Sequence, residues 1–302
     1  MNAAMQRKPL PARAALDTQS IERLPENARL AVEHVWRCFS NIGGLAGLFI
    51  TGSVARGLDA PDDLDLIAIW DRPITDAQRR ELVSMCRGNR VSDPDTDRFH
   101  LHGVVPEFHF MAGKEQVHRM ITSFCWRGEL PPDSDADRVE GLLASLVDAI
   151  PAYDPEAISQ QWQKMLLDDY PREYQARRVF EQYAAACRRL AHFTRCGSRY
   201  DLFYWTQARL TFCEHIVKTL VSLNRRYYWG TKWIQQQVER LRLKPENAWQ
   251  RMCVILSAQA DEAQAEMKRI AVSTGKIVRA ALPEVDVDFS LNLARLMRRS
   301  QH

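Results

Sequence analysis

The chain has 302 residues, of which 46% are hydrophobic and 26% are charged. These values are ordinary for a soluble globular protein with a sizeable core, and the length favours two domains. The net charge is only +3, and the absence of any apolar run long enough to span a bilayer excludes a membrane-spanning class. Seven scattered cysteines without a Cys-x-x-Cys pair argue against a disulfide framework or a zinc site and fit free thiols in a reducing cytoplasm.

The first half of the chain predicts a mixture of helices and strands. Residues 1–18 lack the apolar stretch of a secretory signal, so we expect a flexible N-terminal arm there. Apolar residues at three- and four-residue steps predict a helix over residues 19–41, which Gly43-Gly44 would end. The next predicted elements are strands at 48–50 and 64–70, a helix at 75–87, strands at 99–103 and 104–111, and helices at 114–124 and 135–150.

The pattern changes after residue 150. Prolines at both ends of residues 151–155 predict a linker. Beyond it the pattern is almost entirely helical, at about 155–168, 172–195, 200–223, 231–242, 246–273 and 290–300. The sequence therefore predicts an α+β fold, with a mixed N-terminal domain over residues 19–150 and an all-α helical bundle over residues 151–302.

Charge is divided unevenly between the two halves. Residues 1–150 hold 17 Lys and Arg against 22 Asp and Glu, whereas residues 151–302 hold 24 against 16. An acidic half and a basic half suit a site where carboxylates hold a metal and basic groups hold phosphates. A chance asymmetry of solvated faces explains the same numbers equally well.

Residues 50–66 carry the most informative pattern. A predicted strand ends at Gly52-Ser53, where glycine lets a phosphate approach the backbone and the serine hydroxyl and nearby N–H groups favour an anion. Nine residues separate Ser53 from Asp63, and Asp63 and Asp65 point the same way on a strand. Two such carboxylates repel each other unless a cation such as Mg²⁺ lies between them. The pattern predicts a metal clamp beside a phosphate cradle; the bland alternative is a pair of surface turn residues.

This segment resembles the nucleotidyltransferase superfamily that includes DNA polymerase β, the antibiotic nucleotidyltransferases and the CCA-adding enzymes. The family pattern is Gly-Ser, nine to thirteen residues, then Asp-apolar-Asp-apolar, and a third carboxylate on a later strand. Gly52-Ser53 and Asp63-Leu64-Asp65-Leu66 match it, and Ala55-Arg56-Gly57 matches a common extension. The resemblance implies that Gly52, Ser53 and Arg56 bind the nucleotide and that Asp63 and Asp65 are catalytic metal ligands.

The third carboxylate of the family pattern is expected on a neighbouring strand. Glu107 is our choice, because it lies in the predicted strand 104–111. The resemblance implies that it acts as a general base or as a further metal ligand. Two observations weigh against it: Pro106 is awkward inside a strand, and Asp93, Asp95 and Asp97 in a polar loop compete for the role.

The C-terminal half has a second, local resemblance. Residues 223–233, with the sequence Leu-Asn-Arg-Arg-Tyr-Tyr-Trp-Gly-Thr-Lys-Trp, resemble an uncharacterised bacterial nucleotidyltransferase-like group of the DUF4037 type, as do Tyr153-Asp154-Pro155 and Asp169-Tyr170-Pro171. On this reading Lys232 and Arg225 neutralise a triphosphate, and Tyr227 or Tyr228 stacks on a base. The alternative reading is helix packing by the aromatic residues and solvation of the cations.

The two resemblances together imply a Mg²⁺-dependent enzyme that moves a nucleoside monophosphate, AMP as the first expectation, from a triphosphate such as ATP to a hydroxyl of a small molecule. The C-terminal domain would bind substrate or nucleotide. RNA, tRNA or protein as the acceptor is one alternative, and a catalytically inactive nucleotide-binding regulator is another. Paired arginines in the basic half permit a nucleic-acid partner, but no RNA-binding module is recognisable. The sequence does not decide whether the protein forms a homodimer.

Overall fold

A computed structural model describes residues 16–40, 43–58, 63–87, 100–132, 134–196 and 202–288. The described chain forms two compact units, each made of two segments. Unit 1 is drawn from Met1–Trp126 and Ser145–Asp169, and unit 2 from Arg127–Ala144 and Tyr170–His302. The chain therefore passes from one unit to the other three times.

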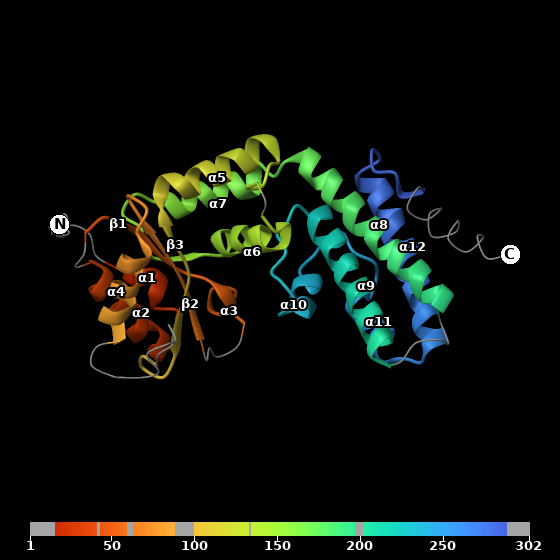
Figure 1. Cartoon of the computed structure of the whole chain (residues 1–302), viewed down its shortest axis with the longest axis horizontal. Coiled ribbons are helices and arrows are strands. Elements are labelled where there is room, and N and C mark those ends of the chain that lie inside the picture. Colours follow the sequence, from red (N-terminus) through yellow and green to blue (C-terminus); the bar gives the residue numbers. More distant parts are fainter. Residues whose placement is uncertain are drawn as a thin grey trace. The chain divides into compact units, whose positions relative to one another are not determined.

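Unit 1 holds a mixed four-stranded sheet with the order β3-β2-β1-β4 (Figure 1). Its strands are β1 (Leu45–Ile50), β2 (Asp63–Trp70), β3 (Val105–Gly113) and β4 (Ile150–Tyr153). Strand β2 runs parallel to β3, whereas β1 is antiparallel to both β2 and β4. The helices of this unit are α1 (Thr18–Ile21), α2 (Glu26–Ser40), α3 (Gly52–Ala55), α4 (Asp76–Arg87), α5 (Lys114–Arg127) and α7 (Ile158–Asp168).

The core of unit 1 lies between one face of the sheet and helices α2 and α4 (Figure 1). Apolar residues recur on one side of α2, and the Phe39 ring lies 5.9 Å from that of Trp70 in β2 and 5.3 Å from that of Phe108 in β3. Burying side chains of this size contributes about 1.5–3 kcal/mol each. Leu64 and Leu66 belong to the same core, so the residues that alternate with them point to the opposite face of β2.

The segment predicted as a linker is part of the sheet. Strand β4 pairs with β1, and Pro151 lies opposite Phe49. A proline is tolerated there because β4 is an edge strand, so its missing N–H interrupts no ladder. The boundary predicted at residue 150 therefore does not separate the two units, because β4 and α7 both belong to unit 1.

Two other predicted elements of unit 1 differ from the structure. The predicted strand 99–103 is not found in its described part, where Leu101 and Val104 form only an isolated bridge. The chain turns between them with φ of 53° at His102 and 87° at Gly103. The helix predicted over residues 19–41 is interrupted, because Pro25 precedes α2 and its carbonyl accepts the Arg29 N–H of the new helix. Residues 1–15 of the predicted arm lie outside the described part.

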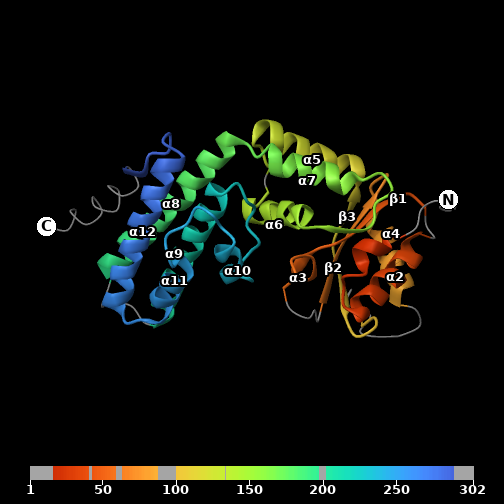
Figure 2. The same ribbon diagram turned by 180° about the vertical axis from the view of Figure 1, so that it is seen from behind.

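Unit 2 is built from helices, which Figure 2 shows from behind. They are α8 (Arg172–Cys196), α9 (Leu202–Leu223), α10 (Ile234–Glu239), α11 (Ala248–Ser257) and α12 (Ala260–Ala281), while α6 (Ala136–Val147) is shared between the units. The helix predicted over 246–273 is two helices, because the backbone at Ala258 turns to the extended ψ of 166°. The helix predicted at 290–300 lies outside the described residues. The α+β fold class is confirmed, and none of the described helices could cross a membrane.

A network of charged groups, most of them buried, joins α6, α8 and α9 inside unit 2. The Arg178 side chain, 8% exposed, pairs with Asp137 and lies 3.0 Å from Glu140, whose carboxylate also accepts a hydrogen bond from Tyr174. Burial raises the pKa of Glu140 and outweighs the opposing effect of Arg178. Lys218 extends the network to Asp137 at 2.6 Å. Burial alone would raise the pKa of Asp137, but Lys218 and Arg178 outweigh it and lower that pKa.

Asn224 closes the turn after α9 with four hydrogen bonds. Its amide nitrogen donates to the carbonyls of Leu220 (2.7 Å) and Leu243 (2.9 Å), and its Oδ1 accepts from the backbone N–H groups of Arg242 (3.0 Å) and Leu243 (2.8 Å). The asparagine of the Leu-Asn-Arg-Arg-Tyr segment therefore has a structural role: it ties the end of α9 to residues 242–243.

We expect Asn224→Ala to lower the free energy of unfolding by about 2 kcal/mol, because the variant leaves the backbone groups that bond to Asn224 without a hydrogen-bond partner. Urea denaturation followed by circular dichroism measures this. Gln259→Ala is the control, since Gln259 is exposed and makes no capping bond within the described structure; its effect should stay within about 0.5 kcal/mol. Equal effects of the two substitutions would contradict the role given to Asn224.

Candidate site at the end of strands β2 and β3

The three predicted carboxylates lie on one face of the sheet. Asp65 is directly opposite Glu107 in the parallel register of β2 and β3, and Asp63 is two residues before Asp65 on the same strand. All three side chains are partly exposed, whereas the alternating Leu64 and Leu66 are buried. Residues opposite each other on neighbouring strands, and residues two apart on one strand, share a face. The structure thus brings together the acidic residues that the sequence singled out.

The position of β3 explains how Pro106 fits into a strand. Strand β3 is at the edge of the sheet, and Pro106 pairs in register with Leu64 of β2. Proline is found in sheets chiefly on edge strands, where its lack of an N–H need not interrupt pairing. The objection that the sequence raised against Glu107 is therefore removed. The competing Asp93, Asp95 and Asp97 lie outside the described residues.

Gly52 closes the turn after β1 against the Asp65 side chain. Its φ of +66° is in the left-handed region, and a Cβ placed on it would lie 1.6 Å from Oδ2 of Asp65. The neighbouring Thr51 N–H donates to the Asp65 carbonyl at 2.9 Å, which holds the end of β1 against β2. No side chain fits at residue 52 unless the carboxyl group of Asp65 moves.

Ser53 and Arg56 follow in the short helix α3 and its C-terminal cap. Ser53 is partly exposed, and its carbonyl accepts the Leu58 N–H at 2.9 Å. The Arg56 side chain, only 8% exposed, forms an ion pair of 2.8 Å with Asp148. This contact gives Arg56 a structural partner and anchors the turn to the segment before β4. Sequence reasoning missed Asp148, which is 92 residues away along the chain.

The described residues contain no group of three or more His, Cys, Asp and Glu side chains that could hold a metal ion by themselves. The predicted three-ligand set of Asp63, Asp65 and Glu107 is therefore not a preformed cluster. Carboxylates on one face repel one another, so they approach closely only around a cation. Mg²⁺ in phosphate-binding sites usually takes one or two carboxylates, and phosphate oxygens and water complete its coordination. The Asp63–Asp65 pair offers donors of that kind, and the Asp65 carboxyl group packs directly against Gly52, in the place that a Cβ would take.

The remaining predicted nucleotide-binding residues lie in unit 2, between α9 and α10. Lys232 is exposed, and so is Arg225, whose guanidinium donates to the Tyr170 carbonyl at 3.3 Å. Tyr227 is only 3% exposed, and its ring lies 5.3 Å from that of Tyr170. Packing against Tyr170 occupies the Tyr227 ring in this structure, and the base-stacking role of Tyr227 stays a prediction. Tyr228 is buried in the same way.

Two shorter stretches of the second resemblance also have structural roles. Asp154 caps α7, since its carboxylate accepts the backbone N–H groups of Ile158 and Ser159, each at 2.9 Å. Tyr170 is buried against Tyr174 and Tyr227. Asp154 thus has a folding role in unit 1, and Tyr170 has one in unit 2.

Comparison with known proteins agrees with the second resemblance. Residues 140–234 match the family model described as Domain of unknown function (DUF4037). The matched residues run from α6 to the start of α10 and include none of the carboxylates on β2 and β3. No curated protein matches the chain.

Two solved structures show a distant likeness to the chain. A nucleotidyltransferase-like protein from Exiguobacterium sibiricum 255-15 is 11% identical, with 85% of this chain and 80% of that chain covered and a TM-score of 0.38. Spectinomycin adenyltransferase AAD(9) from Enterococcus faecialis, with ATP and spectinomycin, is 14% identical, with 81% of this chain and 96% of that chain covered and a TM-score of 0.34. The chain is similar to the DUF4037 family over residues 140–234.

Proposed function

We propose that the protein is a nucleotidyltransferase that moves a nucleoside monophosphate, AMP in the first instance, from a nucleoside triphosphate to a hydroxyl or similar nucleophile of a small molecule. The observation that carries this proposal is the acidic face of β2 and β3 beside the Gly52 turn. Asp63, Asp65 and Glu107 share that face, and Gly52 leaves no side chain between the turn and Asp65. Such a site combines cation binding and close phosphate approach.

Asp63 and Asp65 are the residues that would hold Mg²⁺. The bound ion would neutralise charge on the phosphates and stabilise the departure of pyrophosphate. The two aspartates would fix the position of the ion. Both lie on one strand, whose alternate residues are buried in the core of unit 1. A rigid strand holds such groups more accurately than a loop does.

The remaining groups of the site would bind the triphosphate and accept a proton. The Ser53 hydroxyl and the N–H groups of the turn after β1 donate hydrogen bonds to the β- and γ-phosphates. Glu107, opposite Asp65, accepts the proton of the attacking hydroxyl. In the reaction an oxygen–phosphorus bond forms at the α-phosphate, the bond from that phosphorus to the β-phosphate oxygen breaks, and pyrophosphate leaves with the electron pair. Positioning of the reactants is expected to supply most of the rate.

The direct test uses the purified full-length protein with Mg²⁺ and each of the four α-³²P-labelled nucleoside triphosphates in a cell metabolite extract, with and without RNase. The double variant Asp63→Asn/Asp65→Asn removes both charges at nearly constant size. Asp71→Asn, an exposed aspartate just beyond β2, is the matched control. We expect label in a small product, loss of that product in the double variant, and no effect of RNase or of the control substitution.

Other outcomes of this experiment would change the proposal in specific ways. An RNase-sensitive labelled product would identify RNA as the acceptor, and a protein-sized product would identify a protein. Transfer that survives in the double variant would remove Asp63 and Asp65 from the mechanism. No transfer from any of the four nucleotides would contradict the proposal and favour a nucleotide-binding protein without this activity.

A further inference from the structure

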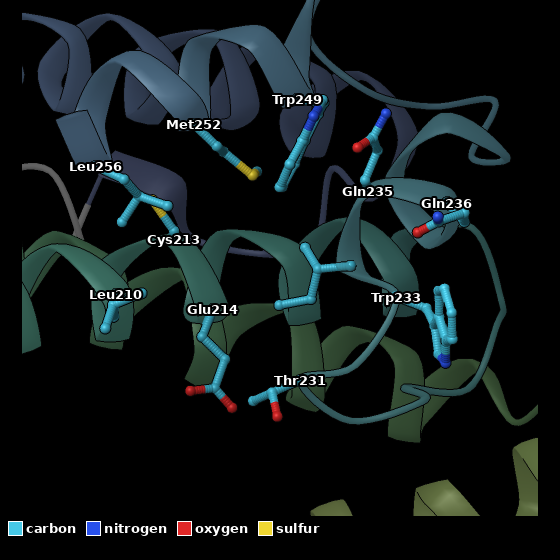
Figure 3. Close-up of a pocket in the computed structure, with 11 residues that line it drawn as sticks. Leu210, Cys213, Glu214, Thr231, Trp233, Gln235, Gln236, Trp249, Met252 and Leu256 are labelled. Carbon is cyan, nitrogen blue, oxygen red and sulfur yellow. The ribbon is translucent and has the colours of Figure 1, made fainter. Parts of the chain in front are cut away.

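Unit 2 contains a pocket of about 400 Å³ between α9, α10 and α11. Its walls come from Leu210, Cys213 and Glu214 of α9, from Thr231, Trp233, Ile234, Gln235 and Gln236 around α10, and from Trp249, Met252 and Leu256 of α11 (Figure 3). All of these residues lie within one unit, so the pocket is formed by the helical part alone. Its volume is within the range that holds small organic ligands.

The body of the pocket is apolar and aromatic. Figure 3 shows the side chains of Trp249 and Met252 projecting from α11 toward α9. Trp233 stands on the α10 side and is held by a backbone with φ of 63°, an uncommon conformation for so large a residue. It is the tryptophan of the Lys-Trp pair that ends the segment singled out in the sequence. Two partly exposed indole rings at one concave surface provide π faces for a ligand.

The charge of the lining favours a cation. Among the eleven described lining residues, Glu214 is charged and none is Lys, Arg or His. Its side chain is 31% exposed and lies toward Thr231 (Figure 3). Lys218 reaches Glu214 at 2.7 Å, and the same ammonium also lies 2.6 Å from Asp137, a carboxylate that pairs with Arg178 as well. The Tyr228 hydroxyl donates to Glu214 at 3.3 Å.

We propose that this pocket is a binding site for a small organic cation, a protonated amine or quaternary ammonium carried on a flat apolar body. The apolar body would lie against the indoles of Trp233 and Trp249, and the cationic group would face Glu214. Tryptophan faces attract such cations, and the attraction is larger where the contact excludes water. The lining offers phosphates no cation, so this site is distinct from the nucleotide site proposed on β2 and β3.

The test is a binding titration with three probes that share one ring and differ in charge: phenethylamine (cation), 2-phenylethanol (neutral) and phenylacetate (anion). Full-length protein labelled with ¹⁵N at tryptophan reports each indole N–H by NMR, and Trp233→Phe and Trp249→Phe assign the two pocket signals. We expect phenethylamine to shift both signals and to bind about tenfold more tightly than 2-phenylethanol, with phenylacetate weakest.

The substitution Glu214→Gln separates charge recognition from pocket shape. We expect it to remove the tenfold preference for phenethylamine while leaving the dissociation constant of 2-phenylethanol unchanged, which also shows that the pocket is still folded. Glu262→Gln, an exposed glutamate in the first turn of α12, is the matched control and should change nothing. The proposal is overturned if the three probes bind equally well, or if neither indole signal moves. Because no nucleotide is present, failure here leaves the proposed transfer reaction untouched.

Discussion

Replacing Gly52 by alanine is expected to abolish transfer activity. The new Cβ would lie 1.6 Å from Oδ2 of Asp65, a distance at which the carboxyl group must move. A misplacement of about 1 Å at a reacting centre costs on the order of 10²-fold in rate, and displacement of a proposed metal ligand should cost more, so we expect a loss of at least about 10³-fold in kcat/KM. The assay is the labelled transfer reaction once an acceptor is known.

The chain offers a matched control for this substitution. Gly57 has nearly the same backbone conformation, with φ of +65°, but a Cβ on it would meet no atom within 4 Å. Gly57→Ala should therefore cost about 1–2 kcal/mol of stability from the left-handed conformation while leaving most of the activity. Comparable activity losses in both variants would show that backbone strain, and not the contact with Asp65, explains the effect at Gly52.

The second large effect is expected in unit 2, where Arg178→Met should lower the free energy of unfolding by about 3–5 kcal/mol at neutral pH. Methionine fills a similar volume but leaves the buried Glu140 without its guanidinium partner. Arg172→Met on the same helix is the control, because the ion pair of Arg172 with Glu284 is exposed and should contribute far less to stability. Urea denaturation curves for the wild type and both variants measure the difference.

The effect of Arg178→Met should depend on pH in a defined direction. The pKa of Glu140 is already raised in the folded protein by burial, and the guanidinium opposes that rise. Loss of the guanidinium raises the pKa of Glu140 further. The free energy of unfolding of the variant therefore falls over a wider pH range than that of the wild type as the pH increases above 4.5. The pKa of Asp137 is lowered in part by Arg178, and the stability it provides is lost only as the pH falls below 3.8 toward the lowered folded pKa. The gap between wild type and variant should therefore narrow as pH falls from 7 toward 4, and a constant gap would contradict this account.

The local part of the candidate site could be predicted from the sequence. Asp63 and Asp65 are two residues apart on a strand whose apolar residues alternate with them, so their shared face follows from strand geometry alone. The placement of Glu107 depends in addition on β3 being an edge strand parallel to β2. Pro106 made a strand at this position hard to predict from the sequence. The register found in the structure agrees with the predicted face, while the metal and nucleotide roles of these residues stay predictions.

Long-range features could not be read from the sequence in the same way. The pairing of Arg56 with Asp148 and of β4 with β1 joins segments about 100 residues apart, and neither leaves a local pattern. Aromatic residues next to arginine and lysine suggested a binding surface, yet Tyr227 proved to be core and Trp233 lines a pocket. Composition alone does not separate these cases, because an aromatic ring suits a core and a ligand site equally well.

The three passages of the chain between the units, all between residues 126 and 170, have a consequence for synthesis on the ribosome. Asp137 leaves the ribosome 81 residues before its partner Lys218. At about 5–20 residues per second, that interval is about 4–16 s. During this interval the last strand of the unit 1 sheet, β4, is synthesised. The acidic residues of α6 still lack their partners on α8 and α9. Unit 1 can therefore finish folding first, while residues 127–144, the first segment of unit 2, still lack their helical partners.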